Sequence, residues 1–262
     1  MPFATLNGIQ LHYRDEGDPT GAPVVFINSL GSTLQLWDPV LQHLPAGLRI
    51  LRADMRGHGQ TDVPPAPYAM GQLVKDTEAL LEHLNVKDAL VVGLSIGGMI
   101  AQGLAVKRLD LVRAMVLSNT AAKIGSPKMW DERIEAVQTK GLPAVAPEIM
   151  TRWFGRDFQA RPEMAHWQAM LAASPAEGYI GCCAAIKGTD FYTPTSGLRL
   201  PTLGIAGPED KTTPPDLVRE TVELIPGARM ELLRRAGHLP CVEKPVEYAQ
   251  LLTDFMKETG HV

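Results

Sequence analysis

Short apolar segments recur along this chain, and stretches with helical spacing separate them. The predicted strands are residues 24–27, 50–53, 89–94, 114–117, 202–206 and 230–233. The predicted helices are residues 70–84, 96–106, 216–224 and 245–257, and the first carries apolar side chains at a spacing of about 3.6 residues. Strands that alternate with helices form parallel sheets with right-handed crossovers. The pattern therefore predicts an α/β fold with a mostly parallel sheet and helices on both faces.

A hairpin is predicted ahead of this alternation. Residues 3–6 and 9–13 flank Asn7-Gly8, and both positions of such a two-residue turn favour positive φ. Apolar Ile9 and Leu11 alternate with polar residues, as on a strand that is buried on one face only. The first two strands should therefore be antiparallel.

The alternation of strands and helices stops near Thr120. Residues 122–192 show no strand-like alternation, and prolines and glycines interrupt them repeatedly. Three of the four tryptophans lie in this stretch, namely Trp130, Trp153 and Trp167. We therefore expect a helical cap at residues 122–192, inserted into a core domain formed by residues 1–121 and 193–262.

Composition and charge narrow the class of protein. The 262 residues suit one large α/β domain or a domain with an insertion, and the net charge of −4 favours neither a nucleic-acid partner nor an anionic membrane surface. No apolar run approaches the roughly 18 residues of a membrane-spanning helix, and the first residues lack a signal-peptide pattern. We expect a cytoplasmic protein, and both a monomer and a homo-oligomer are compatible with these features.

The cysteines indicate neither a disulfide framework nor a metal site. The chain has three, Cys182, Cys183 and Cys241, and no two of them form a C-x-x-C pair. We interpret them as small buried residues with free thiols and expect no metal ion.

The segment Gly93-Leu94-Ser95-Ile96-Gly97 follows a predicted strand and precedes a predicted helix. A nucleophile in the pattern G-x-S-x-G sits on a sharp, strained turn, and the glycines let that turn close. The helix that follows directs its N-terminal amides toward developing negative charge. Ser95 is therefore the candidate nucleophile, and a plain strand–helix turn is the alternative.

A serine hydroxyl needs a base and an orienting carboxylate to react. Among seven histidines, His238 follows the last predicted strand, so its loop should overhang the strand ends. Asp210 follows the strand at 202–206 and is the candidate acid, with Glu209 as the second choice. The alternatives are a buried structural histidine and a solvated loop carboxylate. The chain order Ser, Asp, His is typical of one fold of serine hydrolases.

An oxyanion formed at Ser95 needs backbone N–H donors. One should be Ile96, and the other should be Leu30, in the loop after the strand at 24–27. His58, in the segment 54–59, also follows a strand, but we interpret that loop as structural, with Asp54 and Arg56 in local hydrogen bonds.

These motifs resemble the α/β-hydrolase superfamily along the whole chain. The matching features are D-x-R-G-H-G at residues 54–59, G-x-S-x-G at Ser95, G-x-x-D-x-x-T-P at 207–214 and G-H-x-x-x-x-E-x-P at 237–245. The resemblance implies a mostly parallel sheet of the eight-stranded type with a helical cap. It also implies hydrolysis by a Ser95–His238–Asp210 triad.

Within the superfamily, the chain looks most like the 3-oxoadipate enol-lactonases. The residues that carry this likeness are 27–32, where many relatives have His-Gly in place of Asn28-Ser29, together with 36–38, 150–154 and 181–190. The likeness implies hydrolysis of an anionic enol-lactone to 3-oxoadipate in aromatic catabolism, without a metal or organic cofactor. A carboxylesterase, a C–C bond hydrolase, a perhydrolase and a ligand receptor without turnover are the alternatives.

A substrate with a free carboxylate requires a cation in its pocket. Arg133 and Arg152 of the expected cap are the candidates, because arginine binds carboxylates in a bidentate manner. Trp130 and Trp153 are candidate pocket walls. The alternatives are exposed helix arginines and tryptophans that fill the core of the cap.

Overall fold

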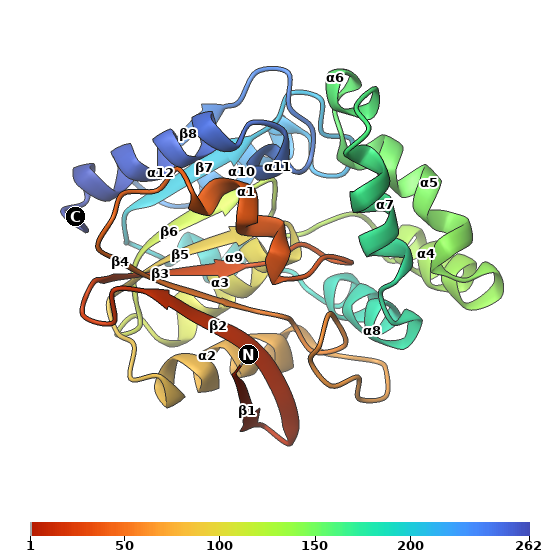
Figure 1. The fold of residues 1–262 in the computed structure, drawn as a ribbon, viewed down its shortest axis with the longest axis horizontal. Helices are drawn as coiled ribbons and strands as arrows, with labels where there is room; N and C mark the ends of the chain where they lie inside the picture. Colours follow the sequence, from red (N-terminus) through yellow and green to blue (C-terminus); the bar gives the residue numbers. More distant parts are fainter. Residues whose placement is uncertain (1) are drawn as a thin grey trace.

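One sheet of eight strands forms the centre of the structure, a computed structural model that describes residues 2–262 (Figure 1). The strands are β1 (Phe3–Leu6), β2 (Ile9–Gly17), β3 (Ala22–Ile27), β4 (Leu48–Ala53), β5 (Ala89–Leu94), β6 (Val112–Ser118), β7 (Thr202–Ala206) and β8 (Arg229–Leu232). They lie in the order β1-β2-β4-β3-β5-β6-β7-β8, and all neighbours from β4 to β8 are parallel. The predicted α/β fold class is confirmed.

Helices cover both faces of this sheet. They are η1 (Leu34–Trp37), α1 (Asp38–Leu41), α2 (Met70–His83), α3 (Ile96–Lys107), α9 (Tyr192–Ser196), α10 (Pro215–Val222), α11 (Pro240–Glu243) and α12 (Pro245–Glu258). Helix α2 packs on α3 and α3 on α9, whereas α1 and α11 pack on α12. The strands run between α2 and α12 in Figure 1, so these two groups lie on opposite faces.

The N-terminal hairpin forms as predicted, but its second strand is longer than expected. Asn7 and Gly8 have φ of 50° and 78°, and β1 pairs antiparallel with β2. Strand β2 continues past residue 13 and pairs antiparallel with β4. Three of its four added residues, Arg14, Asp15 and Glu16, are charged, and Asp15 bonds Arg49 across the pair at 2.7 Å. These residues form ion pairs between strands and do not alternate between apolar and polar side chains. The sequence pattern therefore did not predict this part of β2.

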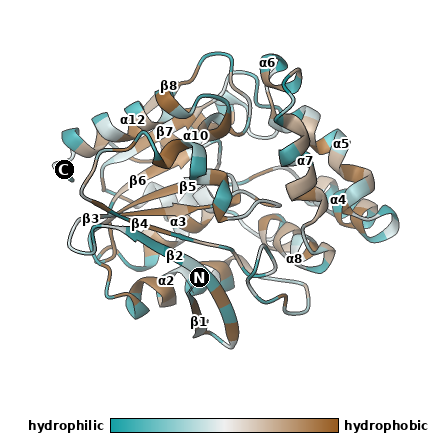
Figure 2. Ribbon diagram, viewed as in Figure 1, coloured by the Kyte–Doolittle hydropathy of each residue, from teal (hydrophilic) through white to brown (hydrophobic). Residues whose placement is uncertain are grey.

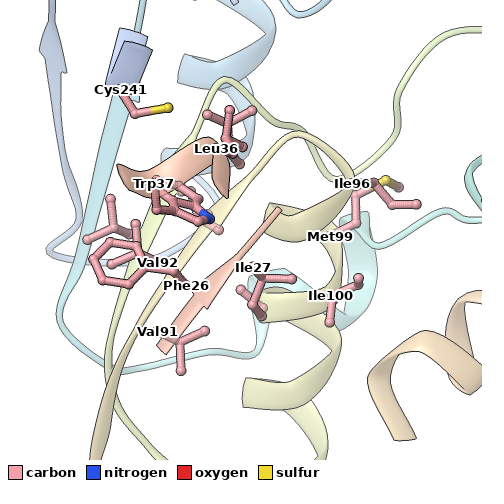
Figure 3. Packing of buried hydrophobic residues seen from close by; sticks show 14 of the residues in the cluster. Phe26, Ile27, Leu36, Trp37, Val91, Val92, Ile96, Met99, Ile100 and Cys241 are labelled. Atoms are coloured by element: carbon pink, nitrogen blue, oxygen red, sulfur yellow. The ribbon is translucent and has the colours of Figure 1, made fainter. Parts of the chain in front are cut away.

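The central strands of the sheet are deeply buried in the apolar core. Every residue of β5 is buried, and Figure 2 shows brown, apolar ribbon concentrated in the centre of the sheet. On one face the Trp37 ring lies 4.8 Å from the ring of Phe26 on β3, and Figure 3 shows both beside Val92 of β5. The indole Nε1 of Trp37 donates to Asn28 Oδ1 at 2.9 Å, so the core also anchors the loop that follows β3.

Five helices lie between β6 and the return of the chain through α9. They are α4 (Pro127–Lys140), α5 (Leu142–Trp153), α6 (Arg156–Gln159), α7 (Met164–Ala172) and α8 (Ala176–Lys187). They gather at one end of the sheet in Figure 1, and no strand is present among residues 122–192. This helical content matches the expected cap, while the domain boundaries remain a prediction.

No single helix of residues 2–262 is long and apolar enough to cross a bilayer; α7 and α8 pass such a test only as a pair bent by 91°.

A buried carboxylate joins the cap to the C-terminal part of the core. Glu243 Oε2 accepts the Gly155 N–H at 2.9 Å, and Glu243 Oε1 accepts the Gly237 N–H at 2.7 Å. Beside it, the His238 N–H donates to Trp153 O at 2.6 Å. The end of α5 and the loop after β8 are therefore held together through backbone groups, and a charge change at Glu243 should affect both.

We expect Glu243 to make stability depend on pH. Burial raises the pKa of Glu243 to about 7 from 4.5, against the two backbone hydrogen bonds that lower it. The folded protein therefore holds this proton more tightly than the unfolded chain. The contribution of Glu243 to the free energy of unfolding is largest below pH 4.5 and is lost as the pH rises through about 7.

Urea unfolding of the wild type and of Glu243→Gln at pH 5 and pH 8 measures this contribution. The stability of the wild type relative to the variant should fall by roughly 2 to 3 kcal/mol between the two pH values. Glu247→Gln is the matched control, because Glu247 is exposed on α12 and the charge change is the same. A wild-type-to-Glu243→Gln difference that stays constant with pH would contradict the assignment.

Candidate active site

Ser95 occupies a strained turn between β5 and α3. Its φ of 59° and ψ of −121° lie in a region that side-chain-bearing residues rarely adopt. The turn can close because a Cβ at Gly93 would overlap the backbone of Gly97, and a Cβ at Gly97 would overlap the carbonyl of Ile27. The predicted glycines are therefore required by close contacts between backbones at this turn.

The backbone of Ser95 is fixed on both sides. Its N–H donates to Ser118 O on β6 at 3.0 Å, and its carbonyl accepts the Thr120 hydroxyl at 2.6 Å. Ile96 is the first residue of α3, a position whose N–H has no partner within a helix. The turn thus presents the Ser95 side chain with a helix N-terminus directly beside it.

His238 and Asp210 form a buried hydrogen-bonded pair. His238 Nδ1 lies 2.8 Å from Asp210 Oδ2, and both side chains are almost completely buried. A proton on Nδ1 satisfies this bond, so the neutral ring has Nε2 as its unprotonated nitrogen. The pair therefore has the arrangement of a base that an acid orients.

Asp210 is surrounded by donors. Its Oδ2 also accepts Thr213 Oγ1 at 2.7 Å, and its Oδ1 accepts the backbone N–H groups of Thr212 and Thr213 at 2.7 and 3.0 Å. Burial opposes ionisation, but attraction to His238 and the side-chain hydrogen bonds outweigh it, so the pKa of Asp210 lies below its usual value. Asp210 is therefore held as a carboxylate.

The second-choice acid serves a different contact. Glu209 Oε2 accepts the backbone N–H of Arg156 in the cap at 2.8 Å, and the Glu209 N–H donates to Ala236 O. The structure thus places Asp210, and not Glu209, beside His238. Glu209 instead links the cap to the loop after β8 through hydrogen bonds.

Asn119 is a site residue that the sequence reasoning missed. Its Nδ2 donates to Asp210 Oδ2 at 2.9 Å and to Gly237 O at 3.1 Å, and its φ is 44°. One side chain thus ties the acid to the loop that carries His238. A signal was available, because Asn119 follows the strand between those of Ser95 and Asp210, at the same edge of the sheet.

A cavity beneath the cap collects most of the predicted site residues. Ser95, His238 and Leu30 line it from the core, and Trp130, Arg133, Arg152 and Trp153 line it from the cap. Asp210 lies behind His238, and Ile96 is fully buried beneath the turn. The other walls of the cavity are mostly apolar, with Ile124, Met129, Ile149 and Ile186 among them.

The two cap arginines are half-buried cations without a carboxylate partner among residues 2–262. Arg133 Nη1 donates to Tyr179 Oη at 3.4 Å, and Arg152 Nη2 donates to Lys211 O at 3.5 Å, both long contacts. The Trp130 indole is held by Ile124 O at 2.6 Å. The cavity thus combines two available guanidinium groups with fixed aromatic walls, an arrangement suited to a small anion with an apolar body.

His58 supports the loop after β3 from outside this cavity. The Gly31 N–H donates to His58 Nε2 at 3.0 Å, while His58 Nδ1 faces Arg56 O at 3.2 Å. Complete burial lowers the pKa of His58, which keeps the ring neutral so that Nε2 can accept. This agrees with the structural role expected for the loop. The bonds of Asp54 and Arg56 reach farther than the local ones expected: Asp54 Oδ1 accepts the Leu34 N–H, and Arg56 donates to Asp76 on α2.

Known proteins resemble the chain along its full length. The alpha/beta hydrolase fold family matches residues 22–245. A curated relative, 3-oxoadipate enol-lactonase 2 of Acinetobacter baylyi, is 32% identical over 97% of this chain and 95% of its own.

Two solved structures give the same result. The enol-lactonase from Burkholderia xenovorans superposes with a TM-score of 0.94 at 35% identity, covering 98% of this chain and 100% of its own. A thermophilic esterase from Thermogutta terrifontis superposes with a TM-score of 0.91 at 26% identity, covering 100% and 99%. Fold, cavity and sequence likeness agree, and this chain belongs to the α/β-hydrolase family.

Proposed function

We propose that this protein is a serine hydrolase that opens 3-oxoadipate enol-lactone to 3-oxoadipate. The observation that carries the proposal is one cavity in which Ser95 and the Asp210-bonded His238 face two arginines without carboxylate partners. The enol-lactonases among its relatives support the same substrate. The proposal includes a small anionic partner, no metal or organic cofactor, and action in the cytoplasm during aromatic catabolism.

In the first step, the Ser95 hydroxyl attacks the lactone carbonyl carbon while His238 Nε2 takes its proton. The carbonyl oxygen becomes an oxyanion, which the N–H groups of Leu30 and Ile96 stabilise. The ring C–O bond then breaks, and His238 returns the proton to the departing enol oxygen. The enol stays attached through the acyl chain and becomes the ketone.

In the second step, water attacks the acyl carbon while His238 takes a proton from it. The second tetrahedral intermediate collapses, the bond to Ser95 Oγ breaks, and His238 returns the proton to Ser95. Asp210 stays ionised throughout, which matches its lowered pKa. The free carboxylate of the substrate pairs with Arg133 or Arg152 while the ring lies against Trp130 and Trp153.

A carboxylesterase for neutral esters is the second candidate, because most of the cavity wall is apolar. A C–C bond hydrolase and a perhydrolase would use the same three side chains. Comparing kcat/KM for the enol-lactone with that for p-nitrophenyl acetate separates these functions. An enol-lactonase should favour the lactone by orders of magnitude, whereas equal values or a preference for the acetate would reject the proposed substrate.

Replacing Ser95 with alanine should remove turnover of the lactone. We expect kcat to fall by roughly 10⁶-fold, as in other serine triads, because no other nucleophile takes its place. Circular dichroism should show an intact fold. Lactone hydrolysis that persists in purified Ser95→Ala would contradict the assignment of the nucleophile.

The cap arginines should distinguish anionic from neutral substrates. A charge-assisted hydrogen bond contributes about 1.5 to 3 kcal/mol, so Arg133→Ala or Arg152→Ala should raise KM for the lactone roughly 10- to 100-fold. KM for the methyl ester of the same lactone should change little. Arg161→Ala is the matched control, since Arg161 is an exposed cap arginine outside the cavity. Equal effects on both substrates would contradict the proposal that these arginines bind the carboxylate of the substrate.

A further inference from the structure

The Ser29 hydroxyl is buried at the cavity with no hydrogen-bond partner. Ser29 is 1% exposed and lines the same cavity as Ser95, and no described group of the protein pairs with its Oγ. Leaving a buried hydroxyl unpaired costs roughly 1 to 3 kcal/mol. A site that keeps such a group beside its nucleophile is poised to donate that hydrogen bond to a bound molecule.

The sheet register places Ser29 next to Ser95. Strands β3 and β5 are parallel neighbours, and Ile27 pairs with Gly93 at their carboxyl ends. Two residues further on, each strand reaches its serine. A Cβ on Gly97 would also overlap the carbonyls of Ile27 and Asn28, so the loop after β3 lies directly on the start of α3. Ser29 therefore belongs to the immediate surroundings of the reacting carbon.

Other polar groups of this loop are already engaged within the protein. The Asn28 side chain binds Trp37 Nε1 and Ala53 O, the Ser32 hydroxyl donates to Ser29 O, and the Gly31 N–H donates to His58. These bonds fix the loop backbone. The Ser29 hydroxyl differs from these neighbours in being available to a ligand.

We propose that the Ser29 hydroxyl donates a third hydrogen bond to the carbonyl oxygen of the substrate, beside the N–H groups of Leu30 and Ile96. The proposal rests on the proposed hydrolase function and adds a catalytic residue to it. The hydroxyl keeps its own proton throughout. Its bond strengthens as the carbonyl oxygen gains negative charge, so it stabilises the transition state more than the ground state.

The sheet order favours the carbonyl oxygen over the departing ring oxygen. Strand β3 lies on one side of β5, whereas β7 and β8, which precede Asp210 and His238, lie on the other side. The departing oxygen must face His238 to receive its proton. An oxygen that Ser29 contacts lies on the opposite side of Ser95, where the oxyanion forms.

Ser29→Ala tests the proposal with two substrates and an inhibitor. We expect kcat/KM to fall about 10- to 100-fold for both the enol-lactone and p-nitrophenyl acetate, since both pass through an oxyanion. Inhibition by a trifluoromethyl ketone, which forms a hemiketal with the nucleophilic serine, should weaken by a similar factor. The melting temperature should stay the same or rise, because a methyl group replaces an unpaired hydroxyl.

Ser32→Ala is the matched control for stability. Its hydroxyl is equally buried in the same loop but is bonded to Ser29 O at 2.7 Å, so its removal should lower the melting temperature. Ser29→Ala activity within twofold of the wild type on both substrates would overturn the proposal, as would unchanged inhibition by the ketone. A loss confined to the lactone would also overturn it and assign Ser29 to the pendant carboxylate. If the wild type does not hydrolyse the lactone but Ser29→Ala still loses acetate hydrolysis, the substrate assignment fails while the role of Ser29 stands.

Discussion

Close packing of backbones around the turn at Ser95 governs the placement of everything else in the site. The left-handed conformation of Ser95 exists because β3, β5 and the start of α3 approach one another without room for a side chain at Gly93 or Gly97. The same approach lays the loop after β3 on the N-terminus of α3. The candidate nucleophile and the candidate oxyanion donors Leu30 and Ile96 are thus positioned by main chain, which deforms less than flexible side chains do.

Asp210 and His238 approach Ser95 from the strands on the other side of β5, and they are tied to the cap. Asn119 joins Asp210 to Gly237, and Glu243 joins Gly237 to Gly155 at the end of α5. The cap residues that would select the substrate therefore share one hydrogen-bonded unit with His238. A change in cap position at this junction should alter base placement and substrate binding together.

The sequence was sufficient to predict the parallel strands, the turn at Ser95 and the helical character of residues 122–192, because each depends on local pattern or spacing. The charged end of β2 was not predicted as strand. Its side chains pair with arginines of β4, so this segment shows no alternation of apolar and polar residues. The roles of Glu243 and Ser29 could not be assigned for a different reason. Their significance lies in which groups surround them after folding, and a buried hydroxyl with no partner leaves no trace in sequence spacing.

Trapping the covalent intermediate tests the central claim most directly. Wild-type enzyme is mixed with 3-oxoadipate enol-lactone, quenched in acid during turnover, digested and measured by mass spectrometry. The account predicts that the peptide containing Ser95 gains the full mass of the lactone, because ring opening releases no atoms from the acyl group. An adduct on a residue other than Ser95 would contradict it, as would lactone turnover that persists in Ser95→Ala.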